Sequence, residues 1–237
     1  MLLPFLAGIR RLSARRQSRY DPTANKMGET AVVKVSVRTL ADIDADSAAA
    51  GNVALHGPVE ARPMIVHGDA AIHLRHYRLG EGAALRWDRP ETDSCAYVLS
   101  GAVEIGGVRL AEGGAFFVEH GAEAVVSAAD RADIAIFEDL HPARKAGGHV
   151  HVIRPENVPT NDDTDHGDQG SSWLILDATC PSCDLWLHRN YMPEGNEVDL
   201  HAHSADEIIF TTSGEIILGQ RRFPAFTAIA ITGGTYY

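Results

Sequence analysis

The sequence predicts an all-β fold made of two copies of one structural unit. From residue 51 onward, short strand-like segments alternate with glycine-containing turns, a pattern typical of β-sandwiches and barrels. A shift of 113 residues, without a gap, places glycines of the first half on glycines of the second. The matching pairs are Gly82 with Gly195, Gly101 with Gly214, and Gly106 with Gly219. A repeat sustained over roughly fifty residues predicts two related units in tandem.

The composition is that of an acidic globular protein. The 237 residues are 45% hydrophobic and 22% charged, with a formal net charge of −11. Because phosphate binding needs a basic surface, we expect neither nucleic acid nor an anionic membrane as a partner. No apolar run approaches the ~20 residues of a membrane-spanning helix. Three cysteines do not make a disulfide framework, so we expect a cytoplasmic protein.

The predicted organisation is a tail followed by the two units. Residues 1–27 are expected to form a flexible basic tail, because an apolar start precedes the arginines, the reverse of a secretory signal. An organelle-targeting peptide, or an extension upstream of a start at Met27, is the alternative. The first unit is predicted to span 28–145 and the second 146–237. Within the first, alternation predicts a strand at 31–38, followed by a short helix at 39–50.

One segment of the second unit carries a candidate metal site. His201 and His203 stand two apart in a segment of extended character, so both side chains are expected on one face. Glu207 follows after a turn and opens the apolar run 208–210, which is predicted to be the neighbouring strand. Two imidazoles and a carboxylate form a three-ligand set for a divalent transition metal.

The spacing Gly-x5-His-x-His-x3-Glu-x6-Gly, from Gly195 to Gly214, resembles the first signature motif of the cupin superfamily. The resemblance implies that the chain is a bicupin, two tandem double-sheet jelly rolls. It also implies that His201, His203 and Glu207 bind a metal inside the second barrel, together with one histidine from a second motif.

The fourth ligand departs from the cupin pattern. With the shift of 113, its position falls on Tyr237, so Tyr236 or Tyr237 is the candidate replacement for the usual histidine. The first copy continues with two more predicted strands that have no counterpart in the second, whose barrel therefore looks incomplete at its C-terminus. Because natural folds avoid an exposed strand edge, we expect a truncated chain rather than an open barrel.

The first copy lacks the metal motif. With the shift of 113 residues, the positions that correspond to His201, His203 and Glu207 are Asp88, Pro90 and Ser94, which cannot form a comparable ligand set. We therefore expect the first barrel to be structural or dimerising, and the chain to be a homodimer.

Two further patterns lack the context of a known site. His149 and His151 form a second His-x-His without a glutamate four residues later, and are interpreted as structural histidines. Cys180 and Cys183 form a lone Cys-x-x-Cys at the predicted turn of a hairpin. They are interpreted as two thiols flanking the turn, with a regulatory disulfide as the alternative.

The resemblance implies a metal-dependent bicupin enzyme, most readily a dioxygenase or other oxidoreductase acting on a small organic molecule. The expected cofactor is a divalent transition metal, first Fe²⁺, with Mn²⁺, Ni²⁺ or Zn²⁺ as alternatives. Asp199 and Asp206 flank the ligands and are candidates for contacts that orient them. The competing hypothesis is a non-catalytic cupin that binds, senses or has a structural role, with a degenerate metal site.

Overall fold

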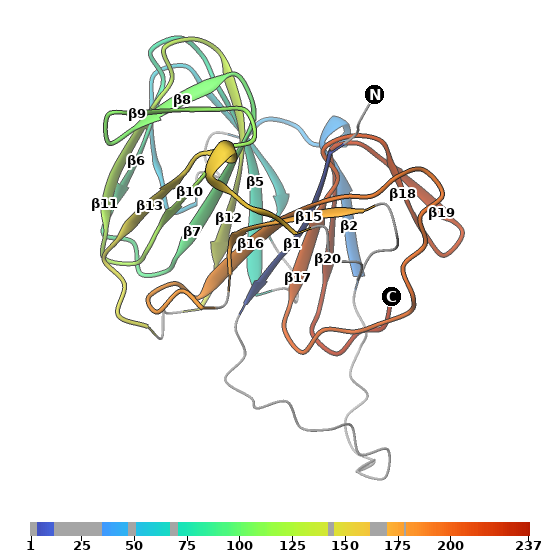
Figure 1. The fold of residues 1–237 in the computed structure, drawn as a ribbon. Helices are drawn as coiled ribbons and strands as arrows, with labels where there is room; N and C mark the ends of the chain where they lie inside the picture. The colour runs from blue at the N-terminus through green and yellow to red at the C-terminus, as the bar shows by residue number, and fades with distance from the viewer. Residues whose placement is uncertain are drawn as a thin grey trace.

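The computed structural model describes residues 4–11, 35–46, 51–66, 71–141, 145–161, 170–177 and 179–237, with only the backbone described at 4–11 and at 161. These residues form strands together with two short 3₁₀ turns, so the predicted all-β class is confirmed. No helix among them is long and apolar enough to cross a membrane. Figure 1 shows two β-structured halves lying side by side.

The first half consists of two facing sheets. The six-stranded sheet has the order β13-β10-β7-β12-β5-β4, and the five-stranded sheet the order β3-β6-β11-β8-β9. The strands of the first sheet are β4 (Val59–Ile65), β5 (Ile72–Leu79), β7 (Ser94–Ser100), β10 (Ala115–Val118), β12 (Ala132–Asp139) and β13 (Val150–Ile153). Those of the second are β3 (Ala54–His56), β6 (Ala84–Asp88), β8 (Ala102–Ile105), β9 (Val108–Ala111) and β11 (Glu123–Ser127).

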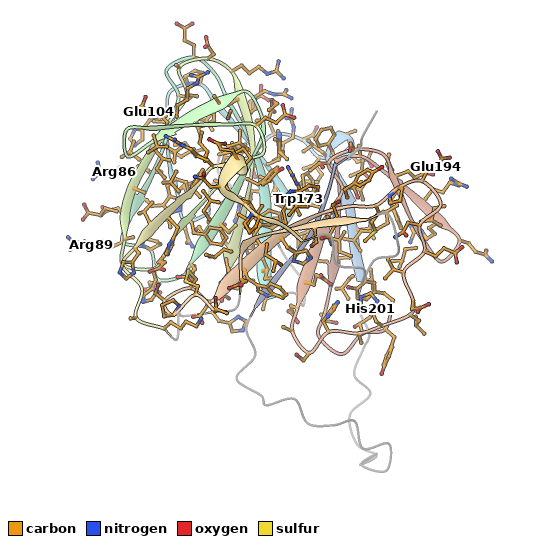
Figure 2. All side chains as sticks on the ribbon, in the orientation of Figure 1. Arg86, Arg89, Glu104, Trp173, Glu194 and His201 are labelled. Atoms are coloured by element: carbon orange, nitrogen blue, oxygen red, sulfur yellow. A yellow bond between two sulfur atoms is a disulfide. The ribbon has the colours of Figure 1, made fainter. Side chains whose placement is uncertain are left out.

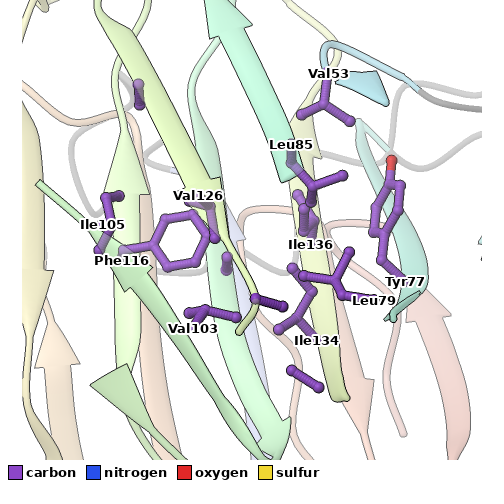
Figure 3. Packing of buried hydrophobic residues seen from close by; sticks show 14 of the residues in the cluster. Val53, Tyr77, Leu79, Leu85, Val103, Ile105, Phe116, Val126, Ile134 and Ile136 are labelled. Carbon is purple, nitrogen blue, oxygen red and sulfur yellow. The ribbon is translucent and has the colours of Figure 1, made fainter. Parts of the chain in front are cut away.

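Apolar side chains from both sheets fill the space between them. Trp87 is fully buried and meets Phe116 edge to face, with ring centroids 5.7 Å apart. Figure 3 shows Phe116, Val126 and Ile136 among the aliphatic side chains that surround this interior. Alternation along each strand turns one set of side chains inward, so the first half encloses a packed hydrophobic core.

The second half consists of a larger sheet and a separate hairpin. The seven-stranded sheet has the order β14-β15-β16-β1-β17-β20-β2, and β18 pairs with β19. Its strands are β1 (Pro4–Arg11), β2 (Val35–Thr39), β14 (Thr160–Asn161), β15 (Ser171–Leu176), β16 (Leu185–Tyr191), β17 (Glu207–Phe210) and β20 (Thr227–Ile231). The hairpin is formed by β18 (Glu215–Leu218) and β19 (Arg221–Pro224).

Strands of the two halves correspond in position under the shift of 113 residues. Adding 113 to the bounds of β8 and β9 gives the bounds of β18 and β19. The same shift places β5, β7 and β10 on β16, β17 and β20, with one bound of each differing by one to three residues. The neighbours also correspond, because β12 lies between β5 and β7 while β1 lies between β16 and β17. The N-terminal strand β1 therefore occupies, in the second half, the place that β12 has in the first.

The two large sheets pack against each other and leave a smaller interior in the second half. Ile208 and Phe210 of β17 lie in the apolar cluster that also contains Phe117 and Phe137 of the first half. Ile209 points the other way, into a cluster with Phe223 of the hairpin. The seven-stranded sheet thus packs one face against the first half and turns its other face toward the interior of the second half.

Some predicted boundaries differ from the observed elements. Residues 4–11, predicted to belong to a tail, form β1, and the rest of the range 1–27 lies outside the described residues. β13 lies in the range predicted for the second unit but is an edge strand of the first half. The predicted helix at 39–50 is wrong over its described part, which contains one 3₁₀ turn, Leu40–Asp42. Asp46 N–H donates to Ala61 C=O (2.7 Å), which ties this segment to β4 instead of closing a helical turn.

A pH dependence of stability follows from Asp133, on β12. Burial raises the pKa of its carboxyl, but hydrogen bonds and charge from His76 (3.0 Å) and Arg78 (3.1 Å) lower the pKa from 3.8 to about 2. A depressed pKa stabilises the fold above the unfolded value of 3.8, and this contribution is lost as the pH falls toward 2. We expect Asp133→Asn to lower the free energy of unfolding at pH 7 by about 1 kcal/mol, because solvent screens this partly exposed group.

The measurement is chemical denaturation between pH 7 and pH 2. Asp133→Asn should flatten the fall in stability between pH 4 and pH 2, whereas the exposed Asp130→Asn should retain it. Identical acid profiles for the wild type and Asp133→Asn would contradict this role of the carboxylate.

Candidate metal sites

The predicted ligands His201 and His203 lie at the rim of the second half. The segment that carries them is extended and pairs with residues near Tyr237, through His201 N–H to Tyr237 C=O (3.2 Å) and Tyr237 N–H to His201 C=O (3.1 Å). The intervening Ala202 forms an antiparallel bridge with Tyr236. The two imidazole centroids are 4.8 Å apart. In Figure 2, His201 lies at the edge of the second half, away from the first half.

Glu207 is the buried member of this group. It opens β17 and has the same parity as Ile209, which directs it toward the interior of the second half. Glu207 is 2% exposed, its Oε2 lies 3.7 Å from His203 Nε2, and the Tyr237 hydroxyl donates a hydrogen bond to the same oxygen. The structure thus gathers His201, His203, Glu207 and Tyr237 at one end of the barrel.

The contacts of His201 define which nitrogen is available as a ligand. Its Nδ1 lies 2.8 Å from the backbone oxygen of Asp199. Because a carbonyl oxygen only accepts hydrogen bonds, Nδ1 is the donor in this contact, which leaves Nε2 as the ring nitrogen that could bind a metal. Histidines that bind metals are oriented in this way by a hydrogen bond to the other ring nitrogen.

Asp206 and the two candidate tyrosines lie close to the predicted ligands in sequence or in space, and their contacts differ. Both oxygens of the Asp206 carboxylate accept backbone hydrogen bonds, from Ala71 N–H (2.5 Å) and Gly233 N–H (2.9 Å). Asp206 therefore holds the loop that precedes Glu207. Tyr236 is 62% exposed, whereas Tyr237 contacts the imidazoles and the carboxylate, so Tyr237 is the tyrosine that lies beside the predicted ligands.

The donor set at this end fits a divalent transition metal. Two imidazoles, one carboxylate and one phenol supply nitrogen and oxygen ligands, which suit Fe²⁺, Mn²⁺, Ni²⁺ or Zn²⁺ and provide no soft sulfur. In the first half, Asp88 is exposed and Ser94 Oγ accepts a hydrogen bond from Trp87 Nε1 (3.2 Å) within the core.

A second polar cluster, which sequence reasoning missed, surrounds Glu119 at the end of β10. Glu119 is 1% exposed, and its Oε2 accepts hydrogen bonds from His149 N–H (2.9 Å) and His149 Nδ1 (2.8 Å). Its Oε1 accepts from Ser182 Oγ (2.6 Å) and lies 2.7 Å from His151 Nε2. Burial raises the pKa of the carboxyl, but the hydrogen bonds from Ser182, His151 and His149 lower it to about 2.

The Cys-x-x-Cys turn completes this cluster. As predicted, it joins two strands of a hairpin, β15 and β16, but Cys180 and Cys183 form a disulfide instead of remaining thiols. Cys183 Sγ lies 3.2 Å from Glu119 Oε1. The turn is held to the first half by Asp184 N–H, which donates to Asp93 Oδ2 (2.7 Å).

Four residues of the cluster have metal-binding side chains in close proximity. Single ligating atoms of Glu119, His151, Cys180 and Cys183 all lie within 4.8 Å of one another. The two short motifs are visible in the sequence, but Glu119 lies 32 residues before His151 and 64 before Cys183. No local spacing therefore indicates that the three segments meet.

The chain resembles solved structures across most of its length. Lactobacillus farciminis oxalate decarboxylase matches with a TM-score of 0.65 and 9% identity, over 88% of this chain and 82% of that protein. A candidate glyoxylate-induced protein from Pseudomonas aeruginosa matches with a TM-score of 0.62 and 11% identity, over 90% and 85%. A candidate dioxygenase from Nostoc punctiforme matches with a TM-score of 0.53 and 10% identity, over 86% and 76%. No protein-family model and no curated protein sequence matches the chain.

These identities are low, so the likeness shows the fold alone: the chain shares the antiparallel jelly-roll architecture of these proteins. Chemistry on this fold has to be argued from the side chains themselves.

Proposed function

We propose that this protein is a metal-dependent bicupin that binds a divalent transition metal through His201, His203 and Glu207 and acts as a dioxygenase on a small organic molecule. The observation that carries the proposal is the orientation of His201 by the Asp199 carbonyl, beside His203 and the buried Glu207. The structural likeness to an oxalate decarboxylase and to a candidate dioxygenase supports metal chemistry at a cupin site.

The surroundings of this site suit a reaction that must exclude bulk water. Ile209, Ile229 and Ile231 are buried in the interior into which Glu207 points. A low-dielectric wall strengthens the interaction of Glu207 with a cation, because solvent screening is weak there. When bound, the metal would supply open coordination positions for substrate oxygens and dioxygen.

Tyr237 gives the site a proton donor. Its hydroxyl hydrogen-bonds to Glu207 Oε2, and its ring lies 4.7 Å from that of His201. The phenol can therefore hold Glu207 in position. If a substrate oxygen takes the place of the Glu207 carboxylate, the phenol can donate its proton to that oxygen.

One observation favours the second candidate function, a non-catalytic cupin that binds or senses a small molecule. The hydrogen bond from Tyr237 satisfies Glu207 without any metal. A site stabilised in this way needs no cation for folding, so metal content and oxygen uptake together decide between the two functions.

The test is elemental analysis of protein purified without chelators. We expect near-stoichiometric metal in the wild type and a loss of at least about tenfold in metal affinity for His201→Ala and for Glu207→Ala, each of which removes a direct ligand. Asp88→Ala, at the position of the first half that corresponds to His201, is the matched control and should keep the wild-type metal content.

Metal-dependent oxygen uptake with a candidate substrate would support the dioxygenase. Stoichiometric metal without oxygen uptake across substrate classes would favour binding or sensing. If His201→Ala, Glu207→Ala and Asp88→Ala all kept the wild-type metal content, the metal site would be elsewhere and the proposal would fail.

A further inference from the structure

We propose that Glu119, His151, Cys180 and Cys183 form a second metal site, which takes zinc when the two cysteines are reduced. This site is independent of the one at His201, because it is built from different segments and contains sulfur. It would join the first half to the β15–β16 turn of the second.

The chemistry of the four side chains fits zinc. Zinc in proteins prefers four ligands drawn from cysteine sulfur, histidine nitrogen and carboxylate oxygen. The ligating atoms already lie within 4.8 Å of one another. Two thiolates bias the site toward zinc over magnesium, calcium or manganese, which prefer oxygen ligands.

The Cys-x-x-Cys turn has a feature expected of a metal-binding loop. Cys183 N–H donates a hydrogen bond to Cys180 Sγ (3.3 Å), and a donor of this kind stabilises negative charge on a thiolate sulfur. Cys180 and Cys183 are 9% and 1% exposed, so bulk water is largely excluded from the two sulfurs. The Lys145 ammonium, which contacts Cys180 C=O (2.5 Å), places a positive charge beside this anionic cluster.

Surrounding hydrogen bonds hold the remaining ligands in place. His149 binds Glu119 Oε2 through both its N–H and its Nδ1, which leaves Oε1 directed toward His151 and Cys183. β13 fixes His151 opposite Phe117 of β10, two residues before Glu119. A disulfide alone requires neither a buried carboxylate nor an imidazole at this place, whereas a zinc site uses both.

The disulfide in the structure is the metal-free form of this site. A dithiol reductant supplies two electrons and two protons, converts the disulfide into two thiols and becomes a disulfide itself. Zn²⁺ then displaces the two thiol protons and binds both thiolates, without any change in its own oxidation state.

The test uses cobalt(II) as a spectroscopic substitute for zinc in the full-length reduced protein. Cobalt bound to thiolates has charge-transfer absorption that cobalt bound only to nitrogen and oxygen lacks, so the readout separates this site from the one at His201. We expect the absorption in the wild type, in His201→Ala/His203→Ala and in the control Cys95→Ala. We expect its loss in Cys180→Ser/Cys183→Ser and after oxidation to the disulfide.

Zinc should displace cobalt, and should raise the melting temperature of the reduced wild type but not that of Cys180→Ser/Cys183→Ser. Glu119→Gln should weaken zinc binding by about tenfold or more. X-ray absorption at the zinc edge of the His201→Ala/His203→Ala protein should find two sulfur ligands, a result that does not depend on the folding of the cysteine variant. A zinc environment without sulfur, or no zinc uptake by the reduced protein, would overturn the proposal.

Discussion

Substitution of Ile9 by proline is expected to destabilise the second half strongly, because β1 is a central strand of its sheet. Ile9 is paired with Leu187 of β16 on one side and with Ile208 of β17 on the other. Proline has no backbone N–H and is excluded from central strands. The loss of a ladder hydrogen bond that leaves a buried group without a partner costs about 1–3 kcal/mol, and the ring also disturbs the neighbouring strand. We expect a loss of roughly 3 kcal/mol in the free energy of unfolding.

Ile9→Val is the matched control, because it keeps the N–H and the β propensity of the residue. Urea denaturation gives the free energies, and hydrogen exchange locates the change, which should be largest at the amides of β16 and β17. Equal stability for Ile9→Pro and Ile9→Val would show that Pro4–Arg11 is not part of this sheet in solution.

The sequence alone predicted the repeat better than the assignment of strands to sheets. Glycines at the same spacing mark the turns of both copies, since Gly101 and Gly214 both have positive φ (72°) before β8 and β18. Glycine adopts that conformation without steric cost, so its position carries local information. The place of β1 between β16 and β17 depends instead on residues far apart in the chain, to which no local pattern is sensitive.

The same contrast applies to the two candidate sites. His201, His203 and Glu207 lie within seven consecutive positions, so a local pattern was enough to single them out, and His203 lies beside both the His201 ring and the Glu207 carboxylate. The Glu119 cluster draws on three separated segments that meet only after β10, β13 and the β15–β16 turn have packed. Tertiary packing decides such a site, and a motif search that considers each segment by itself misses it.

Truncation of Trp87 is expected to have the largest effect in the first half. Trp87 is fully buried in the apolar interior of the first half, contacts Phe116 edge to face and donates a hydrogen bond to Ser94 Oγ. Trp87→Ala removes the largest fully buried side chain and leaves a cavity that the surrounding sheets cannot fill by small movements. We expect a loss of about 3–5 kcal/mol in the free energy of unfolding.

Arg86→Ala is the control on the same strand, because Arg86 is exposed and points away from the interior (Figure 2). It should change the stability by less than about 0.5 kcal/mol. Trp87→Phe should fall between the two, since it keeps most of the apolar contact but leaves Ser94 without the indole donor. Metal content per folded molecule should be the same in all three variants, because the interior of the first half is apolar and neither candidate metal site draws a ligand from it. A loss below about 1 kcal/mol for Trp87→Ala would contradict a packed first half and favour a cavity that can hold a ligand there.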